Sequence, residues 1–262
     1  MFTEAFVQEI VLPNVQSQPI WIAAPIEWAA GVAGTHIAVW NALFAAIQLA
    51  VGLALILDFK TRAALIGSLI WSFIVWWAGE GFGGLLTGSA ALPSGAPGAI
   101  VFYALVAIVV WPEKSRTEAP AEARFLSDGR VRFARWSLAI LWLMGAALEL
   151  QPAARAGRGV GSVFSAPWMV GFVTRAGLGA IVILAVIDVA IAGSLLIPRI
   201  SPLAAWASIV VSLFFWWTGQ DFGQMTTPVG TDPNSGPLWI LLTLCAFPDL
   251  LPIAGRHPVR PH

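Results

Sequence analysis

Residues 76–97, WWAGEGFGGLLTGSAALPSGAP, return in similar form as WWTGQDFGQMTTPVGTDPNSGP at residues 216–237. The two stretches align without a gap at a spacing of 140 residues, and eight of the 22 positions are identical. Composition alone would give about two identities, so the pattern indicates a tandem duplication. In each copy an apolar segment ends, a glycine-rich turn and a polar loop follow, and a second apolar segment begins. The identical pairs are Trp76/Trp216, Trp77/Trp217, Gly79/Gly219, Phe82/Phe222, Gly83/Gly223, Thr87/Thr227, Pro93/Pro233 and Pro97/Pro237.

The composition excludes a soluble globular protein. Of the 262 residues, 58% are hydrophobic and only 11% are charged, whereas a soluble domain carries about 25% charged residues. The interior of a soluble protein of this size is too small to hide so much apolar surface, so the bilayer must be the solvent for much of the chain. The formal net charge is zero, which gives no argument for a nucleic-acid partner.

Seven apolar segments are bounded by charged or turn residues. We predict membrane spans at about 36–57, 61–79, 97–111, 134–150, 177–197, 203–219 and 237–252. A helix needs about 20 apolar residues to cross the hydrocarbon core, so we expect the interrupted stretch 21–34 to be interfacial or re-entrant. The stretch 152–172 is interrupted in a similar way, and its Trp168 follows Trp28 at the same spacing of 140.

The strongly polar stretch 113–133 divides the chain into a first repeat, 1–112, with three spans and a second repeat, 134–262, with four. The predicted fold is therefore an all-α, polytopic membrane protein. Its two parallel repeats each resemble a four-helix bundle, related by a pseudo-two-fold axis along the membrane normal. The span at 134–150 has no counterpart before residue 36. Either the first repeat has lost its leading helix, or translation starts upstream of Met1.

The distribution of basic residues predicts the orientation. With seven spans, eleven of the 14 Lys and Arg residues fall on the side of the linker and the C-terminus. The positive-inside rule places that side in the cytoplasm and both Trp-Trp loops outside. We therefore expect a multi-pass protein of a bacterial-type inner membrane.

Two longer stretches carry a resemblance to a known family. They are QLAVGLALILDFKTRAALIGSLIWSFIVWW, residues 48–77, and VIDVAIAGSLLIPRISPLAAWASIVVSLFFWW, residues 186–217. In each, a helix rich in small residues ends in a short basic or proline-containing turn, and a second helix opens at Arg62-Ala63-Ala64-Leu65 or at Pro202-Leu203-Ala204-Ala205. This arrangement is similar to the DoxX/DoxD-like superfamily of four-helix membrane proteins, although the second copy lacks the arginine.

The resemblance implies a membrane protein that works beside redox enzymes. Relatives are implied in thiosulfate:quinone oxidation and in methylamine-utilisation maturation, and a quinone is the ligand that the resemblance implies. It transfers no catalytic residue onto this chain.

One polar residue lies near the middle of a predicted span in each half. Asp188 is a carboxylic acid within the fifth span, and Gln48 occupies the matching position of the first span. A carboxylate at that depth costs roughly 2.5–3.5 kcal/mol on insertion scales, so it must be neutral, hydrated or paired. We interpret the two as a proton-active or ligand-binding site between the repeats. The alternative is an interhelical hydrogen bond worth roughly 0.6 kcal/mol.

Acidic and amide groups follow both Trp-Trp motifs. Glu80, Gln220 and Asp221 are expected at the carboxyl ends of helices, where a carboxylate opposes the helix dipole by roughly 0.3–1 kcal/mol. They are candidates for an outer-face ligand site or for ion pairs with the three arginines predicted on the same side, Arg155, Arg158 and Arg175. His36 with scattered acids does not make a metal motif, so no metal site is predicted.

The 14 tryptophans cluster at span ends, as is typical of residues at a membrane interface. The alternative for the recurring pairs is a flat aromatic cleft for a quinone or a lipid tail. Its candidate residues are Trp76, Trp77, Trp216 and Trp217.

Taken together, these residues favour a membrane subunit associated with a redox enzyme or electron-transfer complex, binding quinone or lipid between its repeats. The alternative is a non-catalytic structural or assembly subunit of a larger complex, and a small-solute transporter is less favoured. The expected partners are the lipid bilayer and other membrane or extracytoplasmic subunits.

Overall fold

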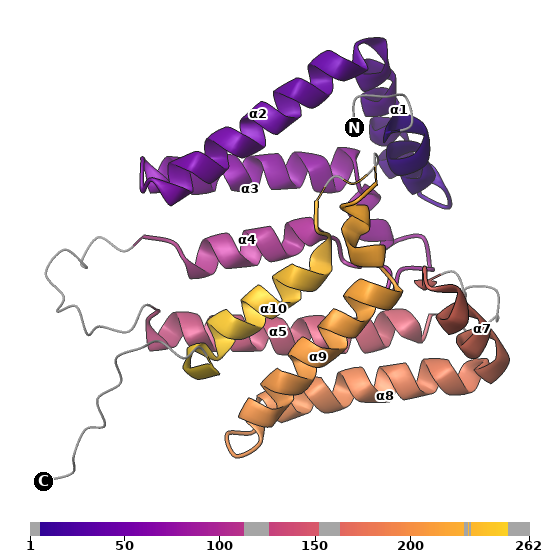
Figure 1. Cartoon of the computed structure of the whole chain (residues 1–262), viewed down its shortest axis with the longest axis vertical. Coiled ribbons are helices and arrows are strands. Elements are labelled where there is room, and N and C mark those ends of the chain that lie inside the picture. The colour runs from indigo at the N-terminus through magenta and orange to yellow at the C-terminus, as the bar shows by residue number, and fades with distance from the viewer. Residues whose placement is uncertain (1–5, 113–125, 152–162, 228–229, 231, 251–262) are drawn as a thin grey trace, which may run out of the picture.

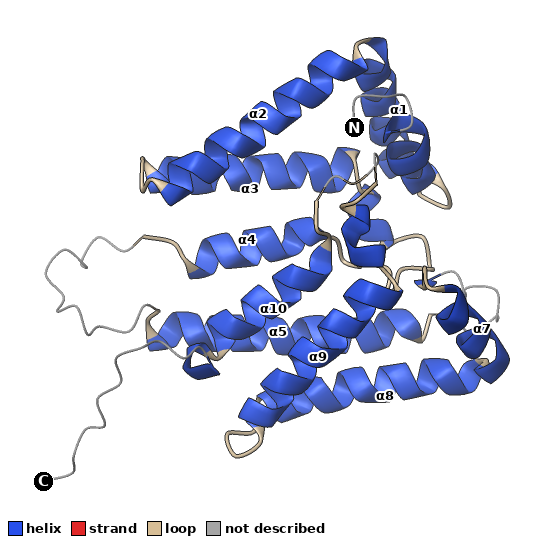
Figure 2. Cartoon of the chain, viewed as in Figure 1, coloured by secondary structure: helices blue, strands red, loops and turns tan. Residues whose placement is uncertain are grey.

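A computed structural model describes residues 6–112, 126–151, 163–227, 230 and 232–250. All secondary structure in these ranges is helical, as Figure 2 shows, so the all-α prediction is confirmed. The longer helices are α1 (Ile20–Thr35), α2 (Ile37–Ile56), α3 (Thr61–Ala78), α4 (Ala99–Val109), α5 (Asp128–Glu149), α7 (Pro167–Ala176), α8 (Leu178–Leu195), α9 (Ser201–Thr218) and α10 (Ser235–Ala246). Short helical turns precede α1 at Phe6–Val11 and Leu12–Val15, follow α3 and α9 at Gly81–Gly84 and Asp221–Gln224, and follow α10 at Pro248–Leu250.

Five of the described helices are long and apolar enough to cross a membrane, namely α2, α3, α5, α8 and α9. The apolar helices α4 and α10 are shorter, and they fall where the third and seventh spans were predicted. The chain is therefore a helical membrane protein whose apolar helices contact lipid.

Two boundaries differ from the sequence prediction. Helix α5 begins at Asp128, inside the stretch predicted as linker, because Ser127 has the extended backbone of an N-cap residue and Asp128 places an acidic group in the first turn. Helix α10 ends at Ala246 rather than near residue 252, because Pro248 cannot continue a helix.

The helices form a layered bundle (Figure 1). Helices α3, α4, α5 and α8 lie one beside the next. Helix α10 packs over α4 and α5, and α9 packs on α8 and α10. The most extensive contact between two helices joins α5 to α8. The main core lies among α4, α5, α8, α9 and α10, and its largest fully buried side chain is Trp142 of α5, which packs on Trp239 with ring centroids 4.7 Å apart.

Helix α2 stands apart from this core at the edge of the bundle. Only 6% of its apolar 18-residue stretch is buried inside the protein, whereas 39% of the corresponding stretch of α8 is buried. Its neighbours are α3 and, more weakly, α1. A smaller apolar cluster beside it joins α1 and the turns before it to Phe82.

Candidate functional site

The two Trp-Trp loops have the same backbone geometry. Phe82 and Gly83 have φ/ψ of 56°/35° and 62°/26°, and Phe222 and Gly223 have 53°/30° and 69°/15°. All four thus lie in the left-handed region, which non-glycine residues rarely adopt. In both loops the positive φ angles run through four consecutive residues, Gly81–Gly84 and Asp221–Gln224, so the two similar sequences share an unusual local structure.

The first tryptophan of each pair fastens its loop. The indole Nε1–H of Trp76 donates to the Pro97 carbonyl at 2.8 Å, and that of Trp216 donates to the Pro233 carbonyl at 2.7 Å. Each ring also meets the following phenylalanine edge-on, with centroids 4.8 Å apart for Trp76 and Phe82. The corresponding separation for Trp216 and its phenylalanine is 5.0 Å.

These hydrogen bonds show that the gapless alignment of residues 76–97 with 216–237 is wrong in its second part. The structural counterpart of Pro97 is Pro233, not Pro237, because these are the prolines that accept the indole bonds. Helices α4 and α10 begin at Ala99 and Ser235, so the spacing falls from 140 residues before the loops to 136 after them. The first loop is therefore four residues longer, and the identity at Pro93 and Pro233 is not a structural match.

The extra residues of the first loop are buried between the halves of the bundle. Leu92 is 1% exposed, and most of residues 90–98 are buried. A Cβ added at Gly219 would strike the Pro93 carbonyl, and one added at Gly95 would lie 2.7 Å from Asn234 Oδ1. The two loops thus touch each other at one end of the bundle, called here the loop end.

Gln220 and Glu80 occupy matched positions but differ in their bonding. Gln220 caps α10, since its Nε2 donates to Ser235 Oγ at 3.1 Å and its Oε1 accepts from the Gly236 N–H at 3.0 Å. Glu80 Oε2 is buried with no hydrogen-bond partner among the described residues. Burial, reinforced by the nearby Asp232 carboxylate, raises the pKa of Glu80 to about 8.

The other loop candidates do not join them. Asp221 is exposed, and so are the second tryptophans of the two pairs, Trp77 at 37% and Trp217 at 49%. Among the described rings, Trp77 contacts Phe73 and Trp217 contacts Trp168 and Phe214, and no ring contact links the first pair to the second. The four tryptophans therefore form two groups. Trp76 and Trp216, called here the loop fasteners, hydrogen-bond to their loops, and Trp77 and Trp217 are exposed on the surface of the bundle.

Asp188 has an acidic neighbour that the sequence analysis missed. Asp188 of α8 is fully buried and Glu149 of α5 is 3% exposed. The two side chains are near enough to interact electrostatically. All four carboxyl oxygens lack a hydrogen-bond partner within the described part of the chain. Two buried acids on adjacent helices, neither hydrogen-bonded, form the acid pair, which is the principal candidate site.

Gly145 makes room for the acid pair. It lies one helical turn before Glu149, and therefore on the same face of α5. A Cβ added there would lie 2.7 Å from Asp188 Oδ2 and would also collide with the side chain of Leu92. The missing side chain of Gly145 thus leaves a small space beside Asp188, called here the notch, and the side chain of Leu92 from the first loop fills it.

A nearby set of polar groups shows what a satisfied buried network looks like in this bundle. Trp142, three residues before Gly145, donates its indole N–H to Ser208 Oγ at 3.1 Å. Thr243 Oγ1 donates to the Trp239 carbonyl at 2.8 Å and accepts a hydrogen bond from Ser208 Oγ at 3.1 Å. Within the described residues the acid pair has no such partners, and buried polar groups without them are costly to keep.

Gln48 is not part of this site. It is exposed on α2, whereas its sequence counterpart Asp188 is buried against α5. The structure therefore does not bring the two mid-span polar residues together. Glu149 escaped notice because it closes the predicted fourth span, where a carboxylate is ordinarily assigned to the interface. The available signal was the glycine four residues before it.

The remaining sequence expectations concern ion pairs and metals. Arg155 and Arg158 lie outside the described residues, and Arg175 is exposed in the last turn of α7. No group of three or more His, Cys, Asp or Glu side chains in the described ranges could hold a metal ion.

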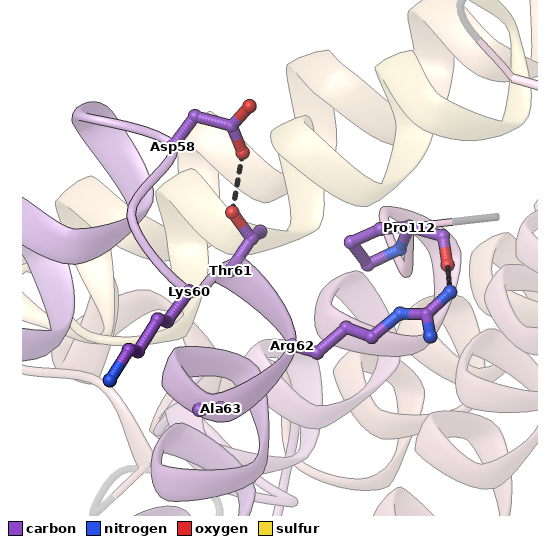
Figure 3. Close-up of a pocket in the computed structure, with 6 residues that line it drawn as sticks. All are labelled: Asp58, Lys60, Thr61, Arg62, Ala63 and Pro112. Carbon is purple, nitrogen blue, oxygen red and sulfur yellow. Dashed lines mark hydrogen bonds between the residues drawn. The ribbon is translucent and has the colours of Figure 1, made fainter. Parts of the chain in front are cut away.

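A surface hollow lies at the turn between α2 and α3, at the opposite end of α3 from the loop end (Figure 1), and Figure 3 shows its lining residues. It is lined by Asp58, Lys60, Thr61, Arg62, Ala63 and Pro112. Thr61 Oγ1 donates to Asp58 Oδ1 at 2.5 Å, and Arg62 Nη2 donates to the Pro112 carbonyl at 3.0 Å. These bonds fix the turn between α2 and α3 and tie it to the end of α4, so the hollow has a structural explanation.

Comparison with known proteins adds no relative to this description. No family model, no curated protein and no solved structure matches the chain. Its function has to be inferred from its own residues and their contacts.

Proposed function

We propose that this chain is an integral membrane subunit that exchanges a proton at the Glu149–Asp188 acid pair and works beside a redox enzyme, with a quinone as the ligand. The observation that carries the proposal is the acid pair itself. Two neighbouring buried carboxyl groups with no counter-ion among the described residues repel each other when both are charged, which favours a state in which the pair holds a proton. A group of this kind inside a membrane is costly and is most often functional.

A quinone fits the chemistry of the pair. Its reduction to the quinol consumes two electrons and two protons, so a site for it needs groups that give up and recover protons. The redox enzyme of the proposal supplies or removes the electrons. The resemblance to DoxX/DoxD-like proteins supports this ligand class, and Leu92 is the apolar side chain that would have to move to admit it.

The test is whether purified protein retains a quinone that depends on the pair. Solvent extraction and chromatography of the wild type should recover quinone, and Glu149→Gln and Asp188→Asn should each lose most of it. Asp221→Asn, which neutralises an exposed carboxylate, is the matched control and should retain it. A wild type without quinone, whose uptake of added quinone is the same in the variants, would overturn the proposal.

We further propose that the loop end faces away from the cytoplasm in a bacterial-type inner membrane, because the turn bearing Lys60 and Arg62 lies at the other end. In a Cys245→Ala background, a membrane-impermeant thiol reagent applied to intact cells should label Ser89→Cys and Thr226→Cys but not Lys60→Cys. Labelling of only one loop would also refute two parallel repeats.

A structural or assembly subunit is the second candidate, favoured by the bare surface of α2. Stoichiometric co-purification of another subunit, together with unchanged behaviour of the Glu149→Gln and Asp188→Asn variants, would favour it over the redox proposal.

A further inference from the structure

Helices α2 and α8 carry corresponding stripes of similar residues, but only the stripe on α8 is covered by other helices. On α8 the stripe is Ala185, Asp188, Ala192 and Leu195. On α2 the residues 140 positions earlier are Ala45, Gln48, Gly52 and Leu55. Spacings of three and four residues place each stripe on one helix face.

The α8 stripe is in the interior of the protein. Its four residues are between 0% and 5% exposed, and α8 makes its most extensive contact with α5. The α2 stripe has no such cover: Ala45, Gln48 and Leu55 are exposed, and Gly52 has no atom within 4 Å of its Cβ position. No described helix occupies the place on α2 that α5 occupies on α8 (Figure 1).

An exposed glutamine in the middle of an apolar span calls for a hydrogen-bond partner. Lipid tails offer neither donor nor acceptor, so an amide facing them loses the hydrogen bonds it makes in water. Gly52, one turn further along, allows another helix to approach closely, as small residues do at helix contacts in membranes.

We infer that the α2 stripe is the contact surface between two copies of this chain, packed about a two-fold axis along the membrane normal. The amide side chain favours a second copy, because it carries both a donor and an acceptor and so satisfies its own symmetry mate. The α5 helix of a second copy could not fill the place, since residues such as Leu138 and Trp142 are already buried in its own core. The exposed stripe of the second copy's α2 is free to do so.

Cysteine cross-linking in native membranes tests the contact. In a Cys245→Ala background, Ala45→Cys should form a covalent dimer on mild oxidation, because a disulfide needs Cα atoms about 6 Å apart. Ala46→Cys, the next residue and on the other side of α2, is the matched control and should remain monomeric. Equal cross-linking of both variants, or of neither, would overturn the inference. A cross-link from Ala45→Cys to a different protein would also overturn it, and would show that a foreign helix occupies the stripe.

The strength of the dimer gives an independent measurement. Gly52→Leu should abolish dimerisation in detergent or lipid nanodiscs, whereas Gly193→Leu, at an exposed glycine of α8 with equally open space, should not. Gln48→Leu should weaken dimerisation about threefold, the effect of one average interhelical hydrogen bond. A Gly52→Leu variant that remains dimeric would refute the contact, and the cross-linking result stands whether or not that variant folds.

Discussion

Helices α2 and α8 begin from similar sequences and end in opposite surroundings. Each leads through a short turn into a helix that ends in Trp-Trp, and each has a polar residue at the same depth. The polar residue of α8 is a carboxylic acid sealed against α5, and that of α2 is an amide on an open face. The comparison teaches that a neighbouring helix, rather than the helix itself, decides what chemistry a mid-span polar group can have.

The largest expected effect tests whether the two loops are truly equivalent. Gly83→Ala and Gly223→Ala should each destabilise the protein by about 3 kcal/mol or more, because the methyl group meets backbone atoms of Pro97 or of Pro233 at a positive φ. Thermal unfolding in detergent, followed by circular dichroism, measures the change. Gly31→Ala, at an open helical position, should be neutral or slightly stabilising. A large loss in only one of the two loop variants would break the equivalence.

The second effect separates the two mid-span positions. The double variant Glu149→Gln/Asp188→Asn replaces two buried acids that have no partner in the described part of the chain by neutral amides. It should stabilise the fold by about 0.5–2 kcal/mol while abolishing proton exchange at the pair. The exposed Asp221→Asn should change the unfolding free energy by less than about 0.5 kcal/mol. A destabilised double variant would mean that the acid pair is held by a partner, such as a bound cation.

A smaller effect concerns the loop fasteners. Trp76→Phe and Trp216→Phe keep an aromatic ring but lose the indole donor, so each should cost about 1 kcal/mol or slightly more. Trp77→Phe and Trp217→Phe, at exposed rings, should cost less in the same unfolding assay. Equal costs at all four positions would argue against the division into fasteners and surface residues.

The last comparison distinguishes Glu80 from its counterpart Gln220 by the pH dependence of stability. A folded-state pKa of about 8, well above the ordinary value of 4.5, means that the folded protein retains a proton that the unfolded chain has released. Stability should therefore fall as pH rises from about 4.5 to about 8. Glu80→Gln should remove that part of the pH dependence, which melting temperatures measured across the window would reveal. The raised pKa of Asp232 acts in the same direction and should remain.

The apolar pattern of the sequence predicted the helices well, because a bilayer leaves helices as the only way to satisfy the backbone of such segments. Boundaries at Asp128 and Ala246 were missed where local capping and Pro248 outweighed hydropathy. The duplicated motif predicted two alike loops, but it could not show that the first is four residues longer. Accidental identities at the prolines concealed the insertion.

The candidate site was only half predictable. A carboxylate such as Asp188 in the middle of an apolar segment is easily recognised in the sequence. Glu149 becomes a candidate only because α5 packs on α8, and no local sequence pattern predicts that contact. The exposure of Gln48 likewise depends on a helix that the first half lacks. For the same reason, the sequence could not separate the inward Trp76 from the outward Trp77.

The placement of Leu92 over Gly145 bears on how the protein is made. The loop that carries Leu92 leaves the ribosome before α5 does, because it precedes α5 in the chain. If the chain were divided after residue 112 and the two fragments were produced separately, the second fragment would lack Leu92. The space beside Gly145 and Asp188 would then be unfilled. Leu92 is therefore synthesised before both carboxyl groups that it helps to cover.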